Sequence, residues 1–571
     1  MRSISDAAVG LCKQRLCPEI LEDIVDDEAH CSRFTGAPKA EPSRSATVPM
    51  KRCHWLLLAI VLSSLALGLS LLTHGQNWGG DFAGYILQAQ SIAGGGLQSF
   101  VERNTFAVRE SSAVFGPVAY PWGFPLLLSP LVLVFGLSLL PFKLLGLAFF
   151  IAFLVAAFLL FEPRLGCRDA TLLVAVLGFS PMLLRFNDNV LSDVPFLFLS
   201  TTALVVMDRA LVLPKKLSSS ISVSVLLGFL LFAASFVRSN GLLLLPTLLV
   251  INGVGYWRLR HSPSALSGKN GELLSAAVPY IVLATLFIVS SAVFPEGGSS
   301  HIELLALRGK TILHNMRYYL ELPSDLFRVF PIRQSALLIY GMCMPFLLVG
   351  IIRTVKRDYH FAVYAALTLI TYVLWPYVQG VRFLFPVLPL FIYFVFEGMR
   401  HSRFALANVN HRLGMALTYA FWVCVLALFF VDSTRAAVAN LRSERARAGP
   451  FDSGSREMFD HMSAQTGAGV VVGFFKPRVM RMMTDRDAVL LHEVEALCRA
   501  DYYVHSKRVS AGSEQIQADQ LEVQSSVGKL RQVWENEGFT IYRTVGCAGG
   551  DDAEAFRVSS AHFSDSLTSD R

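Results

Sequence analysis

The stretch Gly79-Gly80-Asp81-Phe82-Ala83-Gly84-Tyr85 follows directly after the first long apolar run of the chain. It places a carboxylate, Asp81, where a membrane helix is expected to end and water to begin. Tyr85 comes four residues later and would lie on the same face of a helix, where it can orient Asp81 or anchor at the lipid headgroups. We therefore expect Asp81 and Tyr85 at a membrane surface, either as functional residues or as ordinary interfacial ones.

The composition of the whole chain is that of a membrane protein. The 571 residues are 53% hydrophobic and 16% charged, whereas soluble domains carry about 25% charged residues. The mean hydropathy is +0.49, and apolar runs long enough to cross about 30 Å of hydrocarbon recur many times. Much of the net charge of +7 lies in short loops between these runs. Such charges set membrane topology, so they do not indicate nucleic-acid binding.

The basic loops also predict how the chain crosses the membrane. Lys51-Arg52 precede the first apolar run, at about 55–73, which indicates a cytoplasmic N-terminus. Segment 123–161 is ambiguous: it forms either two spans or one interfacial or embedded segment, 123–141, followed by one crossing. A single crossing places the short basic loops inside and the short acidic connections outside, so the positive-inside rule favours it. The total is then about eleven spans.

The predicted fold class is an all-α polytopic membrane protein with a small C-terminal extracytoplasmic α/β domain. The predicted parts are a disordered cytoplasmic leader at 1–50, a transmembrane domain at 51–435 with its first outer loop at 74–142, an α/β domain at 440–546, and a disordered tail at 547–571. Cys498 and Cys547 fall in or next to the outer domain, where they can form a disulfide or remain two free thiols.

A second group of polar residues lies between two later spans, in Arg185-Phe186-Asn187-Asp188-Asn189-Val190-Leu191-Ser192-Asp193-Val194-Pro195. Acids at a membrane edge are costly unless they are paired, so Asp188 and Asp193 are candidates for function. Asp193 also fits a helix N-cap with Pro195 in the first turn, and the two roles are compatible.

Two arginines complete the set of candidates. Arg238 opens Arg238-Ser239-Asn240-Gly241, and Arg382 lies in Gln379-Gly380-Val381-Arg382-Phe383-Leu384-Phe385-Pro386. Arginine stays charged and binds phosphate bidentately, which suits a lipid phosphate or pyrophosphate. A lone arginine at a helix end more often extends its charge to the interface. In the favoured topology, however, all these acids and arginines lie on one side of the membrane.

These motifs resemble those of the GT-C class of integral-membrane glycosyltransferases, in particular the branch with protein O-mannosyltransferases and lipid A aminoarabinose transferases. The matching features, over roughly 55–400, are GlyAspPheAlaGlyTyr at 80–85, TyrProTrpGlyPhePro at 120–125, AsnValLeuSerAspValPro at 189–195, ArgSerAsnGly at 238–241 and ArgPheLeuPhePro at 382–386. The resemblance implies the GT-C fold. It also implies transfer of a sugar, hexosyl or pentosyl, from a polyprenyl-phosphate donor to a lipid, glycan or protein acceptor at the extracytoplasmic face, with inversion.

The resemblance also implies roles for the candidate residues. Asp81 corresponds to the presumed catalytic base, Asp193 to the second acid, and Arg238 and Arg382 to phosphate-binding arginines, with Tyr85 and Asp188 as further substrate-binding candidates. No cofactor is indicated besides the lipid-linked donor; a divalent metal is compatible with the chemistry, but no His, Cys or Asp spacing demands one. The implied location is a bacterial inner membrane. The competing hypothesis is a polytopic transporter or lipid flippase, although the charged residues do not lie at mid-span as they do in transporters.

Overall fold

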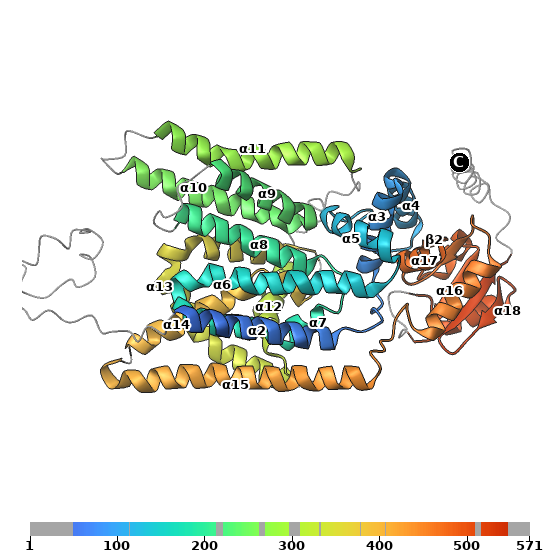
Figure 1. Ribbon diagram of the computed structural model, residues 1–571. Helices are drawn as coiled ribbons and strands as arrows, with labels where there is room; N and C mark the ends of the chain where they lie inside the picture. The colour runs from blue at the N-terminus through green and yellow to red at the C-terminus, as the bar shows by residue number, and fades with distance from the viewer. Residues whose placement is uncertain are drawn as a thin grey trace, which may run out of the picture. The chain divides into compact units, whose positions relative to one another are not determined.

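The computed structural model describes residues 50–113, 115–212, 221–261, 269–295, 309–329, 333–376, 378–405, 407–508 and 515–545. Except for Met50, the predicted leader at 1–50 lies outside the described residues, as does the predicted tail at 547–571. The described chain is mostly helical and has one small sheet close to its C-terminal end (Figure 1). This agrees with the predicted helical membrane protein that carries a small α/β domain.

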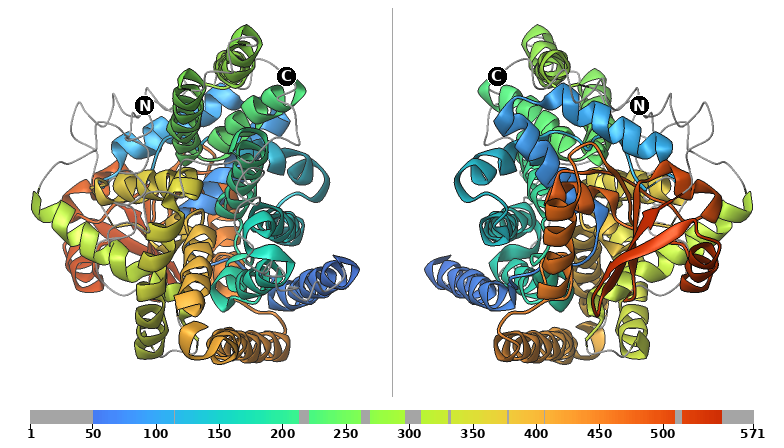
Figure 2. Two further views of the ribbon diagram at one scale, coloured as in Figure 1. Left: turned by 90° about the vertical axis from the view of Figure 1, so that its left-hand side faces the viewer. Right: turned by 90° about the vertical axis from the view of Figure 1, so that its right-hand side faces the viewer.

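Seven of the described helices are long and apolar enough to cross a membrane. They lie in α2 (Met50–Leu71), α6 (Leu139–Gly178), α8 (Asp193–Met207) with the π-helical turn η3 (Asp208–Val212), η4 (Ser239–Leu243) with α10 (Leu244–Arg260), α11 (Lys269–Val293), α13 (Arg333–Val373) and α15 (Ala407–Arg442). The bundle also contains the shorter helices α7 (Pro181–Phe186), α9 (Ile221–Val237), α12 (Gly309–Glu321) and α14 (Leu388–Ala405), with the 3-10 turns η6 (Leu322–Phe327) and η7 (Val381–Leu384). Figure 2 shows the bundle along its helices.

The two longest helices each bend into two antiparallel parts. α6 has 40 residues, and its backbone leaves the helical region at Gly166, where φ is 74°. Leu154 and Gly178, which flank Gly166 at equal distance along the chain, lie against each other, so the chain reverses there. α13 has 41 residues and leaves the helical region at Asp358. A straight helix of either length would span about 60 Å, twice the hydrocarbon thickness, so each bend converts one overlong helix into two.

The ambiguous segment begins with α5 (Gly123–Phe135), which has 13 residues and contains Pro130. At 1.5 Å per residue α5 is about 20 Å long, too short to cross the hydrocarbon layer. The structure therefore favours the alternative with one crossing, made by the first half of α6.

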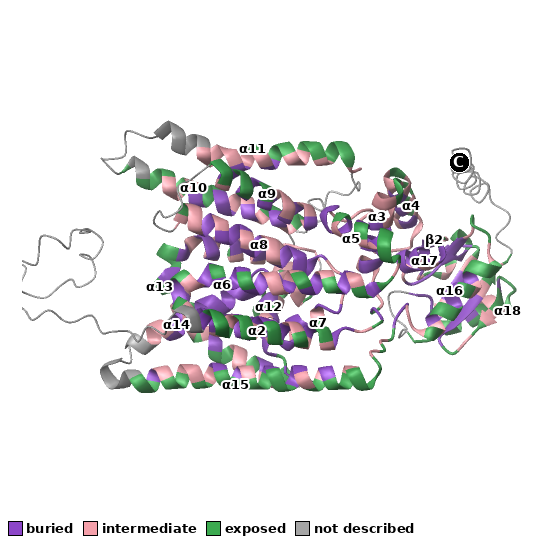
Figure 3. Ribbon diagram, viewed as in Figure 1, coloured by how far each residue is buried: buried purple, intermediate pink, exposed green. Residues whose placement is uncertain are grey.

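The core of the bundle consists of α6 and α8, whose most apolar windows are 56% and 61% buried. The corresponding windows of α11 and α15 are only 11% and 17% buried, and Figure 3 shows these helices with largely exposed surfaces. Because their exposed side chains are apolar, these surfaces suit contact with lipid rather than water.

A buried ion network joins four helical elements at the bends of α6 and α13. The Arg164 guanidinium donates to both carboxylate oxygens of Asp208, at 2.7 and 2.5 Å, and to Asp358 Oδ1 at 2.5 Å. Asp358 also accepts from Arg357 at 2.8 Å, and Arg357 donates to Glu397 at 3.0 Å. Most of these side chains are almost fully buried. The charges are therefore compensated within the bundle and fix the bends of α6 and α13 to η3 and α14.

The C-terminal domain contains a five-stranded mixed sheet of order β2-β1-β3-β5-β4. Its strands are β1 (Val471–Gly473), β2 (Asp487–Val489), β3 (Tyr502–Ser506), β4 (Leu530–Glu535) and β5 (Phe539–Thr544), and its helical segments are α16 (Ser453–Gln465), α17 (Pro477–Thr484), η8 (Val494–Arg499) and α18 (Ala518–Ser526). β1 pairs in parallel with β2 and β3, whereas β5 pairs antiparallel with β3 and β4.

The C-terminal domain packs on the first outer loop. Trp78 lies between the rings of Phe459, Phe474, Phe475 and Phe539, at centroid distances of 5.0 to 6.4 Å. From the same loop, Arg103 in α4 (Leu97–Glu110) bridges to Asp485 and Asp487, both at 2.8 Å. Aromatic packing and ion pairs thus join the loop that carries Asp81 to a domain about 400 residues later in the chain.

Two disulfides involve described cysteines. One joins Cys53 at the start of α2 to Cys167 next to the α6 bend. Cys498 is also disulfide-bonded and is therefore not the free thiol of the second alternative. Cys547, the partner considered in the first alternative, lies outside the described residues.

We expect Arg164→Ala to lower the free energy of unfolding by about 3–5 kcal/mol, because it leaves Asp208 and Asp358 buried with reduced compensation. Arg164→Lys should recover part of this loss by restoring the charge without the bidentate geometry. Thermal unfolding of the detergent-solubilised protein measures the effect, and the exposed Arg353→Ala serves as the control. Equal melting temperatures for the Arg164→Ala and Arg353→Ala variants would contradict a stabilising network.

Candidate functional site

Asp81 lies in the first turn of α3 (Gly80–Gly94), a helix of the first outer loop. A carboxylate at this position is favoured by the partial positive charge of the helix N-terminus. Three residues on, Gly84 faces the Tyr120 ring, and a Cβ atom at Gly84 would come within 2.8 Å of that ring. The glycine therefore lets Tyr120 lie directly against α3, with its hydroxyl beside Asp81.

Both carboxylate oxygens of Asp81 accept hydrogen bonds. Tyr120 Oη donates to Oδ1 at 2.7 Å, and Arg382 Nη2 donates to Oδ2 at 2.6 Å. Tyr120 Oη in turn accepts from Arg478 Nη1 at 2.7 Å. Arg382 comes from η7, between α13 and α14, and Arg478 from α17 of the C-terminal domain. The Asp81 carboxylate thus connects three distant parts of the chain.

These partners keep Asp81 ionised. Burial alone would raise the pKa of this carboxyl group, but the charge of Arg382, the hydrogen bonds from Tyr120 and Arg382 and the charge of Arg478 outweigh it, so the pKa of Asp81 lies below its ordinary value. The pKa of Tyr120 is raised, first because it is buried and also because Asp81 is near. Tyr120 therefore remains a proton donor to an anionic Asp81.

Asp193, in the first turn of α8, lies on the other side of Arg382. Its Oδ1 is 2.9 Å from Arg238 Nη1, and its Oδ2 is 4.0 Å from Arg382 Nη1. Arg238 Nη1 also donates to Ser192 Oγ at 3.3 Å, and the hydroxyl groups of Ser192 and Tyr85 are 2.8 Å apart. Asp193 is nearly fully buried, so its charge acts at short range on both arginines.

Local sequence explains how Arg238 reaches this position. Gly241 packs against the backbone of α9, where a Cβ atom would come within 2.3 Å of Ser235 N. The glycine lets η4 fold back on α9 and directs Arg238, at the N-cap of η4, into the site. The guanidinium groups of Arg238 and Arg382 then lie over the same Phe383 ring, with their central carbons 4.5 and 4.9 Å from its centroid.

These residues surround a cavity of about 820 Å³. Its lining includes Asp81, Tyr85, Arg238 and Arg382, together with Tyr120, Trp122, Phe294, Tyr372 and Phe383. Four of the six predicted site residues therefore line one cavity, and Asp193 contacts the two arginines from behind. The cavity combines apolar walls with a few charged groups that point into it, as ligand sites commonly do.

Asp188 does not line this cavity. Its Oδ1 accepts from Lys143 Nζ at 2.6 Å, its Oδ2 accepts from Arg447 Nη1 at 2.6 Å, and Thr73 donates to both oxygens at 2.7 Å. Lys143 also donates to the carbonyl oxygens of Thr73 and Gly75. This arrangement joins the end of α2, the start of α6 and the connection to the C-terminal domain, and its bonds occupy both oxygens of Asp188.

Sequence reasoning assigned no role in the site to Arg478 and quoted Tyr120 only as part of a motif. Arg478 is buried, lies over the rings of Phe115 and Tyr120 at 5.2 and 5.0 Å, and donates to the carbonyl oxygen of Pro117. Arg478 belongs to the C-terminal domain, whose composition is that of a soluble protein, and no sequence motif there identifies it as a site residue. The signal for Tyr120 was its place in a Tyr-Pro-Trp-Gly motif directly before the apolar segment 123–141.

Among the described residues, no group of three or more His, Cys, Asp and Glu side chains could hold a metal ion. The charged groups described in the site are two carboxylates and three arginines, and tyrosine hydroxyls form hydrogen bonds with them or lie beside them.

The fold was compared with those of known proteins. No protein-family model and no curated protein sequence matches the chain. Among solved structures, ArnT from Cupriavidus metallidurans bound to undecaprenyl phosphate matches with a TM-score of 0.53 and 12% identity, over 88% of this chain and 100% of ArnT. ArnT in the apo state gives the same values. An oligosaccharyltransferase from Archaeoglobus fulgidus matches with a TM-score of 0.48 and 10% identity, over 79% of this chain and 69% of that one.

ArnT is a lipid A aminoarabinose transferase of the GT-C class. The likeness to ArnT confirms the fold that the sequence motifs predicted, because it extends over 88% of this chain and the whole of ArnT. At 12% identity the likeness concerns the fold alone.

The lowered pKa of Asp81 predicts a pH-dependent contribution to stability. A carboxyl group whose pKa is lower in the folded state stabilises the fold above its unfolded pKa of about 4, and this stabilisation is lost as the pH falls. The stability of the wild type relative to Asp81→Asn should therefore fall between about pH 5 and pH 3. Melting temperatures in detergent test this, with the exposed Asp460→Asn as control. A constant difference between wild type and Asp81→Asn would refute the lowered pKa.

Proposed function

We propose that the protein transfers a sugar from a polyprenyl-phosphate donor to an acceptor hydroxyl or amine at the extracytoplasmic membrane surface. The observation that carries the proposal is the shared cavity of Asp81, Arg238 and Arg382, in a fold whose relative ArnT has been crystallised with undecaprenyl phosphate. Such a transfer needs an anionic group that accepts a proton, here Asp81, and cations that stabilise the leaving phosphate, here Arg238 and Arg382.

Asp81 is the proposed general base. In a single displacement the acceptor atom attacks the anomeric carbon as the bond from that carbon to the phosphate oxygen breaks. The acceptor proton passes to Asp81, and the bonding electrons leave with the lipid phosphate. This route inverts the configuration at the anomeric carbon. A phosphate leaves without prior protonation when cations stabilise it, so no separate general acid is required.

Arg382 and Arg238 are the proposed phosphate ligands. Stacking on Phe383 holds both guanidinium groups at one wall of the cavity, and guanidinium groups bind phosphate in a bidentate manner. Arg382 Nη2 is 2.6 Å from Asp81 Oδ2. A phosphate that competes for Arg382 would release Asp81 Oδ2 for the acceptor proton, which couples donor binding to activation of the base.

The remaining predicted residues take supporting parts in this proposal. Asp193 positions Arg238, and Tyr85 shapes the cavity wall through its contact with Ser192. Because its oxygens are already engaged by Lys143 and Arg447, we assign Asp188 to the assembly of the outer loops rather than to substrate binding. The sugar and the acceptor class, whether lipid, glycan or protein, are left to experiment.

The proposed topology has about eleven spans in a bacterial inner membrane. If α6 and α13 count as two spans each, with the second half of α6 continued by α7, the bundle helices α2, α6, α8, α9, α10, α11, α13, α14 and α15 give this number. The cavity and the C-terminal domain then face outward, and the Arg164 network faces inward. The inward end also carries the Cys53–Cys167 disulfide, and a reducing cytoplasm would keep these two cysteines as thiols.

The decisive test is to delete the gene and compare the masses of envelope lipids, glycans and surface proteins with those of the parent. Complementation with the wild type should restore a missing sugar. Asp81→Asn should lower transfer by about 100-fold or more, the range expected for loss of a general base, while the protein is expressed normally. Asp460→Asn, an exposed change of the same kind, should restore the sugar fully. Full restoration by Asp81→Asn would contradict the assignment of the base, and an unchanged envelope after deletion would contradict sugar transfer.

The orientation is tested separately with reporter fusions. Alkaline phosphatase fused behind the C-terminal domain should be active, because it would lie outside the reducing cytoplasm. The same reporter fused after Arg260, at the end of α10, should be inactive, and a fluorescent protein should give the opposite pattern at both positions. The reverse pattern would place the cavity and C-terminal domain in the cytoplasm.

A further inference from the structure

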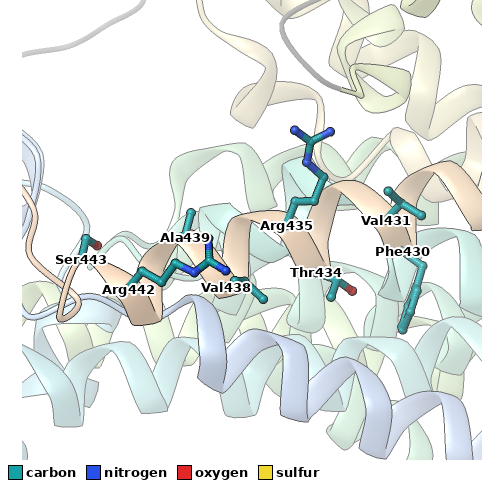
Figure 4. Close-up of a pocket in the computed structure, with 8 residues that line it drawn as sticks. All are labelled: Phe430, Val431, Thr434, Arg435, Val438, Ala439, Arg442 and Ser443. Carbon is teal, nitrogen blue, oxygen red and sulfur yellow. The ribbon is translucent and has the colours of Figure 1, made fainter.

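Two further hollows, separate from the cavity that contains Asp81, lie along the C-terminal half of α15. The first is an apolar groove of about 720 Å³, lined mainly by Phe430, Val431, Thr434, Val438 and Ala439, with arginines at 435 and 442 (Figure 4). Phe430 and Val431 are about half exposed, at 49% and 48%, on a helix that packs little against the bundle. An apolar groove on such a surface suits a hydrocarbon chain rather than water.

The second hollow is a cavity of about 820 Å³ bounded by α7, η6 and α15. Four arginines line it, against two aspartates: Arg185, Arg328, Arg435 and Arg447 face Asp325 and Asp432. Arg185 pairs with Asp432 at 2.6 Å, and Arg447 pairs with Asp188 at 2.6 Å. The lining nevertheless keeps an excess of positive charge, which favours an anionic ligand.

The two hollows adjoin each other on α15, because Arg435 and Ala439 line both of them. An apolar groove and a basic cavity therefore lie next to each other near the end of a predicted membrane helix. We infer that this composite surface binds an anionic lipid, with its phosphate headgroup in the basic cavity and an acyl chain along α15. Free phosphate fits the cavity but not the groove, whereas a lipid of this class matches both in charge and in polarity.

This site differs from the proposed catalytic cavity and does not depend on the transfer reaction. The two cavities share no lining residue, but Val381 lines the basic cavity and the adjacent Arg382 lines the other. The rings of Phe186, from the basic cavity, and Phe385 are 4.7 Å apart. A lipid in the basic cavity would therefore contact η7, the turn that presents Arg382 to Asp81.

Native mass spectrometry of the full chain, titrated with phosphatidylglycerol or phosphatidylcholine, tests this inference. The wild type should prefer phosphatidylglycerol. An arginine near a lipid headgroup contributes about fivefold in affinity, so Arg328→Gln with Arg435→Gln should weaken phosphatidylglycerol binding by about 25-fold. The matched control is Arg353→Gln with Arg412→Gln, which removes two exposed arginines that do not line the basic cavity, one close to the bend of α13 and one close to the start of α15. It should leave binding unchanged.

Val438→Trp adds the second arm of the test, because Val438 lines the groove but not the basic cavity, and the change fills the groove without altering any charge. It should weaken phosphatidylglycerol binding, and excess glycerol phosphate should not displace the lipid. Equal losses in the two arginine double variants would show that general surface charge causes the effect and would overturn the inference. Unchanged binding by Val438→Trp together with displacement by glycerol phosphate would show a site for free phosphate and also overturn it. Because these readouts require no sugar transfer, their failure is distinct from failure of the proposed enzymatic function.

Discussion

The ion pair between Asp81 and Arg382 is the contact on which the rest of the site depends. The two residues are about 300 positions apart in the chain, yet their side chains approach to 2.6 Å in a partly buried setting. Each partner has a second role: Asp81 also binds Tyr120, and Arg382 is also close to Asp193. Because an unpaired charge at such a place is costly, the outer loop, the η7 turn and the start of α8 must come together for any of them to be stable.

Much of this geometry was accessible from the sequence because it follows from one-dimensional signals. Apolar runs predicted the helices, and basic loops predicted the number of crossings. Acids or arginines at the ends of the runs identified the candidate site residues Asp81, Asp193, Arg238 and Arg382. The same signals favoured an embedded or interfacial segment at 123–141, and the 13-residue α5 is too short to span. Patterns of this kind are local, so a single chain suffices to read them.

The other contacts depend on distances in space that no local pattern encodes. Asp188 and Asp193 stand five positions apart and looked alike in sequence, but one lies beside Lys143 and Arg447 and the other beside Arg238. Lys143 lies at the start of a span, where a lone lysine would ordinarily extend toward the headgroups. Arg478 belongs to an ordinary amphipathic helix of the C-terminal domain. The roles of Lys143 and Arg478 emerge only when the C-terminal domain is placed against the first loop.

The position of Arg478 has a consequence for how the protein is made. Asp81 and Tyr120 leave the ribosome early, whereas Arg478, which donates to Tyr120, is synthesised only after the last membrane helix. The first outer loop must therefore wait, partly unsupported, while the whole bundle is inserted. A newly made chain would contain the carboxylate and both arginines of the cavity before its hydrogen-bond chain is complete. Biogenesis thus separates the synthesis of these charged groups from their final alignment, which is complete only when the C-terminal domain has folded against the first loop.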